Sequence, residues 1–419
     1  MANEFAHDKM CTLWDKVAET TSMKMSLSRD LETYNMDSDA NMDRAADASD
    51  NSNANGSDRE FIPQDYRFQV QEGIVSEESD AQDLVDRMIP VNRGKSIRIL
   101  AEIDAKGLRD PMRRDKVAQG FGRDLANYID LYAYQSMING GTMCIKNDDK
   151  FTFQQGIDAE VLMLNRGLGA FDKKLFLANS DYAQVAKDLG VASRDVLVND
   201  ALSRAKIPDL ATFDTMRSDY LVSLAGNTTS NLAVTSETKH TVATYGADEF
   251  YLDNRFMTLP VTNGTATNFP VGTKFTIAGV NFLHPETRVD SGELQTFTVK
   301  TSTTGSAVVS PALVVDGPYR NCSAAAAAAA AIVILNVKES KPSLFYTPES
   351  TVIVPGRLPV PADGAGVRSV EASTEQGLPM RMTYWYDGHK EKFIMKGLVY
   401  FDVQVVYPDM VGTILSNQA

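Results

Sequence analysis

The chain has 419 residues, with 41 basic and 55 acidic side chains, which gives a formal net charge of −14. Hydrophobic residues make up 43% of the sequence and charged residues 23%, proportions typical of folded globular domains rather than of a wholly disordered chain. The acidic balance excludes a protein whose main task is to wrap duplex nucleic acid, because neutralising phosphates requires clustered Lys and Arg.

The sequence contains no recognisable targeting or membrane segment. The N-terminus lacks the apolar core of a secretory signal peptide, and the longest apolar run, residues 324–335, is short and mostly alanine. Three cysteines, Cys11, Cys144 and Cys322, stand far apart, without a CxxC motif or a neighbouring histidine. We therefore expect a soluble protein of a reducing cytoplasm, with no membrane partner, no disulfide framework and no metal site.

The first 60 residues differ in charge from the rest, with 13 acidic and 6 basic side chains. Residues 37–60 are mainly Asp, Asn, Ser and Ala, which bury too little surface to offset the entropy of ordering, so we expect them to be mobile or ordered by a partner. Ahead of them, residues 11–31 predict a short amphipathic helix, which needs a neighbour to dock on because short isolated helices are marginal in water.

Residues 61–103 have the pattern of a long extended hairpin. The apolar residues Phe68, Val70, Ile97 and Ile99 alternate with polar neighbours, as in strands with two different faces. An acidic run separates the two halves. The simplest prediction is two strands joined by a polar loop.

The strongest helix signal begins at Asp110, which can cap a helix, and at Pro111, whose missing N–H costs nothing in the first turn. Apolar residues then recur at intervals of three and four, until residues 139–141 (NGG) end the pattern after roughly seven turns. Gly120 and Gly122 each weaken such a helix by about 1 kcal/mol relative to alanine. Their presence predicts that another backbone packs closely against it.

Residues 153–224 alternate between helical and strand patterns. Residues 174–179 (KLFLAN) predict a buried strand, and helices are predicted at 181–189 and at 193–205, the second bounded by Pro208. This alternation is typical of an α/β or α+β segment.

From residue 226 to about 318 the composition changes to Thr, Val, Gly and Asn, with short alternating runs between turn residues. This pattern predicts a compact all-β unit, a barrel or sandwich. Residues 324–331 are all alanine and predict a helical connector, since alanine costs least in a helix. Mixed structure then returns, with a hairpin at Asp387-Gly388. An all-β block set inside an α/β chain indicates an inserted domain.

No set of residues in the sequence indicates catalysis. None of the four histidines has a Ser, Cys or carboxylate partner at a motif spacing, and no P-loop motif is present. The paired carboxylates Asp248-Glu249 are expected to lie in a solvated turn, and Arg113-Arg114 on the exposed side of the long helix. We therefore predict that the protein is not an enzyme and uses no cofactor.

Several short motifs occur in order along nearly the whole chain. They are QEG, GLRD, RDLAN, LDNRF, GTKFTIAGVNFL, ILNVK and LFY, at residues 71–73, 107–110, 123–127, 252–256, 272–283, 334–338 and 344–346. Together with the acidic arm, the hairpin, the long helix and the β block, this ordered set resembles the major capsid proteins of tailed bacteriophages with the Hong Kong 97 fold, of the P22-like type that carries an inserted domain.

The resemblance implies an α+β fold with an N-arm, an extended hairpin called the E-loop, a spine helix, axial and peripheral domains, and an inserted all-β, barrel-like domain. The implied segments are an arm and acidic spacer (1–60), the E-loop hairpin (61–104), the spine helix (105–145), the axial and peripheral α/β core (146–225), the inserted β domain (226–338) and a return to the core (339–419).

The resemblance also implies a function. Proteins of this family self-assemble into the pentamers and hexamers of an icosahedral virion head, which encloses double-stranded DNA without reading its sequence. A scaffolding protein guides a precursor shell, a portal protein occupies one vertex, and assembly takes place in the cytoplasm of the bacterial host. The competing interpretations are an α/β enzyme with an accessory β domain and a surface adhesin built around the β block.

The residues expected at contacts between molecules fall into three groups, chosen by motif position and charge. One group would meet a basic segment of the scaffolding protein, one would reach a neighbouring capsomer through charged contacts, and one lies in the hairpin and would touch a neighbouring subunit. The three groups are Asp8, Asp15 and Glu19; Asp248, Glu249, Asp253 and Arg255; and Gln71, Glu72 and Gly73.

Overall fold

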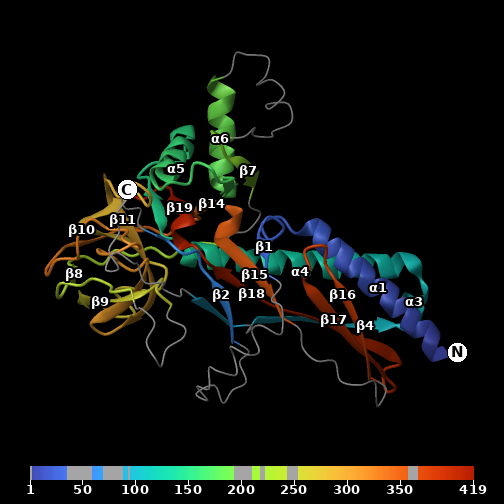
Figure 1. Ribbon diagram of the computed structural model, residues 1–419. Coiled ribbons are helices and arrows are strands. Elements are labelled where there is room, and N and C mark those ends of the chain that lie inside the picture. Colours follow the sequence, from blue (N-terminus) through green and yellow to red (C-terminus); the bar gives the residue numbers. More distant parts are fainter. Residues whose placement is uncertain are drawn as a thin grey trace, which may run out of the picture. The chain divides into compact units, whose positions relative to one another are not determined.

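The computed structural model describes residues 2–34, 59–68, 88–92, 95–192, 210–217, 222–242, 253–356 and 367–419 (Figure 1). The chain divides into two units. The first comprises Met1–Phe61, Pro90–Tyr134 and Thr351–Gln404, and the second comprises Ile62–Ile89, Gln135–Ser350 and Val405–Ala419.

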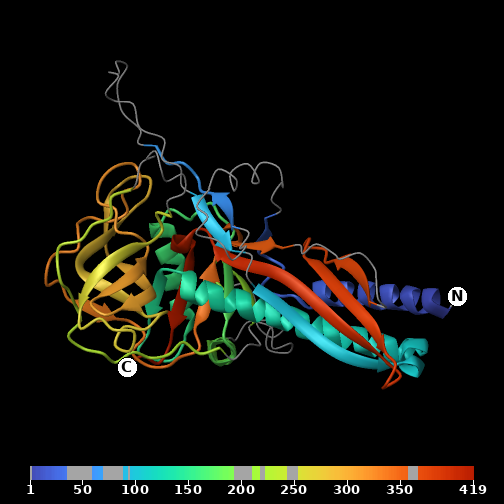
Figure 2. The same ribbon diagram turned by 90° about the horizontal axis from the view of Figure 1, so that it is seen from below.

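The first unit is built on a six-stranded sheet of order β1-β15-β18-β17-β16, in which β4 also pairs with β18. β17 and β18 form an antiparallel hairpin in which Asp387 pairs with Lys392, which confirms the turn predicted at residues 387–388. Figure 2 shows β18 and β4 running alongside α4. The elements are α1 (Ala2–Lys24), β1 (Glu32–Thr33), β4 (Lys95–Asp104), α3 (Ala105–Arg109), α4 (Pro111–Gly140), β15 (Thr351–Pro355), β16 (Val367–Ser373), β17 (Pro379–Asp387) and β18 (Lys392–Val405).

The long helix predicted between residues 110 and 141 is confirmed as α4. Asp110 Oδ1 accepts a hydrogen bond from the Met112 amide (3.0 Å), which is the N-terminal cap that the sequence predicts, and Pro111 is the first helical residue. The start and the end of this helix are therefore set by local signals.

The buried face of α4 includes a basic residue that the sequence analysis placed outside. Arg114 is only 7% exposed and lies one turn before Ala118, which is 1% exposed and belongs to the buried stripe. The expectation that Arg114 is solvated is therefore wrong. Its neighbour Arg113 is exposed, as expected.

The predicted hairpin at residues 61–104 is described in part. The short strands β2 (Arg59–Pro63) and β3 (Met88–Asn92) pair with each other, whereas β4 pairs with β18 along its whole length. Residues 69–87, which include the proposed contact residues 71–73, lie outside the described residues.

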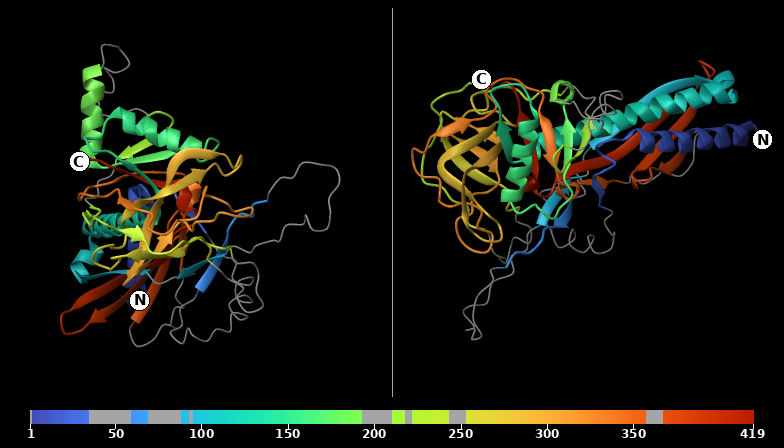
Figure 3. Two further views of the ribbon diagram at one scale, coloured as in Figure 1. Left: turned by 90° about the vertical axis from the view of Figure 1, so that its left-hand side faces the viewer. Right: turned by 90° about the horizontal axis from the view of Figure 1, so that it is seen from above.

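The second unit contains a five-stranded sheet of order β5-β19-β14-β6-β7. The strand predicted at residues 174–179 is confirmed as β6, while the helix predicted at 193–205 lies outside the described residues. Helices α5 and α6 (green in Figure 3) share one apolar cluster with this sheet. The elements are β5 (Met143–Lys146), α5 (Phe153–Asn165), β6 (Lys174–Leu177), α6 (Asn179–Ala192), β7 (Asp214–Arg217), β14 (Ser343–Tyr346), η3 (Pro348–Ser350), η4 (Pro408–Met410) and β19 (Val411–Leu415).

The second unit also contains the predicted all-β block, as a six-stranded sheet of order β13-β10-β11-β12-β9-β8. A bridge between Ala233 and Ala331 joins the two ends of this order, so the sheet closes on itself as a barrel. Its interior is apolar, with Phe269, Phe275 and Phe297 at the centre. The strands are β8 (Ala233–Val234), β9 (Met257–Thr262), β10 (Lys274–Leu283), β11 (Asp290–Thr303), β12 (Ser306–Ser310) and β13 (Ile332–Ile334).

The alanine tract at residues 324–331 is not a helix, so the predicted connector is wrong. Ala326 bridges Thr238 and is fully buried, and Ala331 bridges Ala233. Compared with most other residues, alanine stabilises a helix by less than about 1 kcal/mol per residue. Backbone pairing and burial along the closing edge of the barrel outweigh that preference.

The chain enters and leaves the barrel through two adjacent segments. Leu224 and Ser340 exchange backbone hydrogen bonds of 2.8 and 3.2 Å. Beside them, a Cβ on Gly226 would lie 2.6 Å from the Glu339 amide nitrogen, so only glycine fits at this crossing. The barrel is thus formed by one continuous stretch of the chain. The strands β5, β6 and β7 of the five-stranded sheet precede this stretch, and β14 and β19 follow it.

Candidate assembly surfaces

Helix α1 docks on the sheet of the first unit through one apolar face. Leu13, Trp14 and Val17 are buried, and the Trp14 indole N–H donates a hydrogen bond to the carbonyl oxygen of Met380 (3.0 Å). The amphipathic helix predicted at residues 11–31 is confirmed as α1, together with the neighbour that such a helix requires. It runs from Ala2 to Lys24, so it begins nine residues and ends seven residues earlier than predicted.

Helices α1 and α4 approach each other closely at Gly122. A Cβ at this position would lie 2.7 Å from Thr20 Cβ and 2.9 Å from the carbonyl oxygen of Val17, so glycine is required. The predicted packing of a second backbone against α4 is confirmed here. This prediction is wrong for Gly120, because no atom of the described residues lies within 4 Å of where its Cβ would be.

A buried carboxylate of α4 fixes the segment that follows α1. Asp130 is fully buried, and its two oxygens accept four hydrogen bonds from two serines. Oδ2 accepts from the amide (2.8 Å) and hydroxyl (2.9 Å) of Ser26, and Oδ1 accepts from the amide (2.9 Å) and hydroxyl of Ser28. Hydrogen bonds to a charged acceptor are stronger than neutral ones, so Asp130 anchors the end of the arm.

The opposite face of α1 is acidic. Asp8, Asp15 and Glu19 are exposed and, at spacings of seven and four residues, lie along one side of the helix. Within the described residues no basic side chain pairs with any of the three, whereas the neighbouring Lys16 is paired with Asp115 (2.6 Å). The structure thus brings the three predicted residues together on one solvent-facing stripe, which we call the α1 acidic face.

The Asp253-Asn254-Arg255 motif forms a closed ion pair inside the subunit. Arg255 Nε and Nη2 donate to the two oxygens of Asp253 at 2.8 and 2.6 Å, and Nη1 donates to the carbonyl oxygen of Val405 (2.7 Å). The two side chains are only 6% and 18% exposed. Asp248 and Glu249, which precede the motif, lie outside the described residues.

Two lysines of the barrel bind the C-terminal end of α4. Lys274 Nζ donates to the carbonyl oxygens of Ile138 (2.7 Å) and Gly141, and Lys300 Nζ donates to that of Asn139 (2.7 Å). Burial lowers the pKa of Lys274 to about 7. The last carbonyls of a helix have no partner within it and carry partial negative charge, so two ammonium groups there complete its hydrogen bonding.

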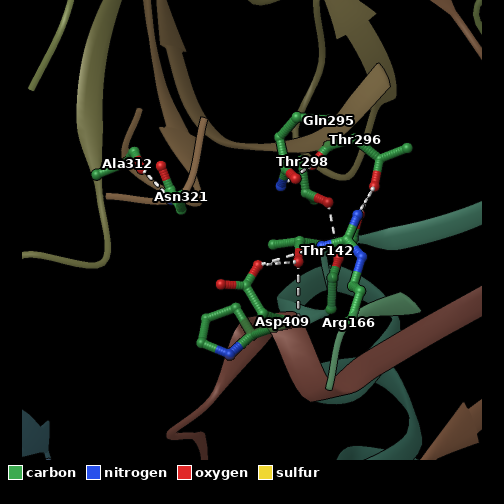
Figure 4. Close-up of polar contacts among 10 residues, drawn as sticks. Thr142, Arg166, Gln295, Thr296, Thr298, Ala312, Asn321 and Asp409 are labelled. Carbon is green, nitrogen blue, oxygen red and sulfur yellow. Dashed lines mark hydrogen bonds and ion pairs between the residues drawn. The ribbon is translucent and has the colours of Figure 1, made fainter. Parts of the chain in front are cut away.

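A buried arginine lies at the same junction (Figure 4). Arg166 Nη1 lies 3.7 Å from Asp409 Oδ1 and Nη2 lies 3.5 Å from Thr296 Oγ1, while the guanidinium stacks 4.2 Å from the centre of the Phe282 ring. Burial lowers the pKa of Arg166, and the Asp409 carboxylate opposes that shift. Thr142 Oγ1 lies 2.9 Å from the same carboxylate oxygen. The barrel therefore meets the rest of its unit through polar and charged contacts.

A polar cavity of about 310 Å³ lies beside the start of α6. Asp181 lines it and is only 4% exposed, with hydrogen bonds from the hydroxyls of Ser343 (2.7 Å) and Ser180 (3.2 Å). Burial raises the pKa of this carboxyl to about 6. Ser416 also lines the cavity, and its buried hydroxyl has no partner among the described residues.

Sequence reasoning missed the buried charged residues Asp130, Arg166 and Lys274. A charged residue in a sequence predicts a solvated side chain, and each of these three finds its partners far along the chain. Lys274, for example, bonds a residue 136 positions away. The one available signal was the interruption of apolar stripes, since Asp130 follows the buried Ile129 on α4.

Among the described residues no three His, Cys, Asp or Glu side chains gather as metal ligands. No helix in the same part of the chain is long and apolar enough to cross a membrane.

A family comparison identifies the chain's relatives. The model of the P22 coat protein family, described as gene protein 5, matches residues 36–416. The chain belongs to this family. The match spans α4, the five-stranded sheet and the barrel, and it begins after α1 and β1, so the first 35 residues lie outside it.

Several solved structures are similar to this chain. The chain is similar to a structure of Mycobacterium phage Che8, with 8% identity, a TM-score of 0.42, and coverage of 93% of this chain and 90% of that one. It is similar to the bacteriophage PhiM1 mature capsid, with 8% identity, a TM-score of 0.42, and coverage of 87% and 83%. It is also similar to the CUS-3 coat protein I-domain, with 35% identity, a TM-score of 0.22, and coverage of 26% and 99%.

Membership of the P22 coat protein family confirms the expected fold class, an α+β phage-capsid fold of the Hong Kong 97 type. The protein is a major capsid protein of tailed phages, and copies of it build the shell of the virion. It is a structural protein and not an enzyme, so the enzyme and adhesin alternatives are wrong.

Proposed function

We propose that this coat protein is guided by a scaffolding protein into pentamers and hexamers, which close an icosahedral shell around double-stranded DNA. The observation that carries the proposal is the α1 acidic face. Three exposed carboxylates on one side of a helix, with no basic partner in the described part of the subunit, form a surface that a basic segment of another protein can cover.

The contacts of the buried face of α1 support this role, because they fix the helix within the first unit. Trp14 packs inside the first unit, Gly122 allows close contact with α4, and Asp130 fixes the chain after α1. A surface that is fixed before binding loses less entropy when its partner arrives. The acidic face therefore offers its charges in one defined arrangement.

The test replaces the three carboxylates by neutral side chains of the same shape, in the variant Asp8→Asn, Asp15→Asn, Glu19→Gln. Each exposed ion pair contributes about 0–1 kcal/mol, so the loss of three pairs should lower scaffolding affinity by up to roughly 100-fold. The affinity of the wild type should fall with added salt. Affinity is measured by calorimetry, and shell yield by electron microscopy.

A control variant removes three exposed carboxylates elsewhere, as Asp124→Asn, Asp172→Asn and Glu286→Gln. It makes the same change in net charge, so a general charge effect would appear in both variants. Normal scaffold-dependent shells from the α1 variant would refute the proposed contact.

A second contact is proposed between capsomers. The Arg255–Asp253 pair is closed inside the subunit, so in this proposal it holds the chain, while Asp248 and Glu249 supply charges for a basic residue across a two-fold axis. Each exposed pair contributes little, but the contact repeats over every copy in the shell. Shells of the variant Asp248→Ala, Glu249→Ala are expected to dissociate at lower urea than shells of a Glu286→Ala, Asp316→Ala control. Equal resistance would contradict the contact.

The remaining parts of the proposal concern the hairpin, the insertion and the other partners. Residues 71–73 are proposed to touch a neighbouring subunit, and residues 226–338 to be an inserted domain, which the paired entry and exit segments at Leu224 and Ser340 support. The proposal also includes a portal protein at one vertex of the shell and assembly in the host cytoplasm. The net charge of −14 favours contact with packaged DNA that is loose and independent of sequence.

A further inference from the structure

Helix α5 carries an apolar stripe on the side that faces solvent. Phe153, Val161 and Leu164 are 41%, 47% and 45% exposed, and the partly buried Ile157 lies between them. At spacings of four, four and three residues, these side chains fall on one face of the helix. We call this set the α5 stripe.

The α5 stripe is distinct from the face that holds α5 on its own sheet. Ala159 and Met163 are fully buried in the apolar cluster that the helix shares with that sheet. The helix is therefore apolar on two sides, one packed and one uncovered within the described residues. Single apolar residues are common on protein surfaces, whereas a stripe along one helix face is typical of a docking surface.

The polar residues that border the stripe are already engaged. Asp158 Oδ1 accepts a hydrogen bond from Gln154 Nε2 (2.9 Å), and Glu160 Oε1 accepts one from Thr212 Oγ1 (2.8 Å). Neither hydrogen bond neutralises its carboxylate, so the border of the stripe stays negative while the stripe itself is apolar. A partner that covers the stripe therefore gains its contact energy there from apolar burial.

The family of this chain indicates what covers the stripe. The protein is a subunit of a shell built from copies of itself, so each copy is surrounded by others. Two copies each carry a net charge of −14, and their contacts work against that repulsion. Burial of apolar surface is favourable whatever the charges of the two chains, and it contributes about 25 cal/mol per Å² buried.

We infer that the α5 stripe is buried against a second copy of this chain in the assembled shell. The inference rests on the proposed assembly into capsomers and names one face of the subunit that makes the contact. In a closed ring of identical subunits such a contact is heterologous, so the stripe meets a different surface of its neighbour.

The test is the substitution Val161→Glu, which places a charge in the middle of the stripe. Because Val161 is exposed in the subunit, the variant should fold and unfold at the same urea midpoint as the wild type. We expect shell yield, measured by sedimentation and electron microscopy, to fall at least tenfold. The control Ala183→Glu adds the same charge at an exposed position of the neighbouring helix α6, outside the stripe, and should assemble normally.

A second measurement identifies the partner. In assembled particles of the variant Val161→Cys, a short bifunctional cross-linker should join residue 161 to another coat chain, as read by mass spectrometry. Normal shells from Val161→Glu, or cross-links only to the scaffolding protein, would overturn the inference. If the wild type formed no shells with its scaffolding protein, the proposed function itself would fail, a result distinct from normal assembly of the variant.

Discussion

Removing the buried carboxylate of Asp130 should release the segment that follows α1. The substitution Asp130→Ala takes away the acceptor of four hydrogen bonds, two from backbone amides and two from hydroxyls. The hydroxyls of Ser26 and Ser28 can turn to other partners. The amide of Ser28, a fully buried residue, has no such freedom.

The size of the effect follows from these contacts. Each amide left without a partner costs about 1–3 kcal/mol, so the two amides together cost about 2–6 kcal/mol. We therefore expect a loss of about 3–5 kcal/mol in the free energy that closes the segment around Ser26 and Ser28. Asp130→Asn keeps one acceptor oxygen, so its effect should be about half as large.

Hydrogen exchange of the backbone amides measures this loss directly, because local opening is detected without unfolding the whole chain. At about 1.4 kcal/mol per factor of ten, the amides of Ser26 and Ser28 should exchange about 100 to 4,000 times faster in Asp130→Ala. The matched control is Asp124→Ala on the same helix, since Asp124 is exposed and pairs with the adjacent Arg123. It should change exchange by less than threefold, because such pairs contribute about 0–1 kcal/mol.

Unchanged exchange in Asp130→Ala, or equal changes in the Asp130 and Asp124 variants, would refute this account of the anchor. The same variants connect stability to assembly. If the α1 acidic face has to be fixed before it binds, then Asp130→Ala should also weaken scaffolding affinity, although it leaves the acidic face itself unaltered.

Three further predictions concern the cores and α4. The pKa of Asp181 in the folded protein is about 6, above its ordinary value of 3.8, so between these pH values the folded state keeps a proton that the unfolded state releases. Wild-type stability should therefore fall as pH rises from about 4 to 6. The substitution Asp181→Asn should remove that slope. In Gly412→Ala the new Cβ would overlap the Phe345 ring, which should cost about 1–3 kcal/mol. In Gly120→Ala the Cβ meets no atom of the described part of the chain within 4 Å, and the helix should gain about 0.5–1 kcal/mol.

Each of these predictions has a clear contrary result. A pH slope that persists in Asp181→Asn would show that other groups produce it. The two alanine substitutions serve as controls for each other in urea unfolding, since both add one methyl group in place of a hydrogen. If their midpoints shifted in the same direction, the difference in packing between Gly412 and Gly120 would not explain their effects.

The parts of the fold that the sequence predicted correctly are those set by neighbouring residues. Asp110 and Pro111 determine where α4 begins, and the Asp387-Gly388 dipeptide determines the turn between β17 and β18. The strand β6 follows from a short apolar run. The ordered motifs along the chain likewise led to the correct family.

The parts that the sequence predicted wrongly depend on distant partners. The alanine tract has a clear local preference for a helix, yet it pairs as an edge of the barrel with residues 233–238. Arg114 is of a residue type that is usually found at the surface, yet it lies on the buried face of α4. In both cases tertiary contacts outweigh a propensity of about 1 kcal/mol or less per residue.

The sequence by itself therefore determined the family, the order of the elements and the charge of the α1 face, because helix caps, alternation and turn chemistry act over a few residues. Only the tertiary structure decided which charges are buried and which apolar side chains remain exposed. Asp130 and Ser26 are 104 positions apart, and no local pattern states that they meet. The α5 stripe became visible in the same way, because exposure is a property of the folded surface and not of the residues that form it.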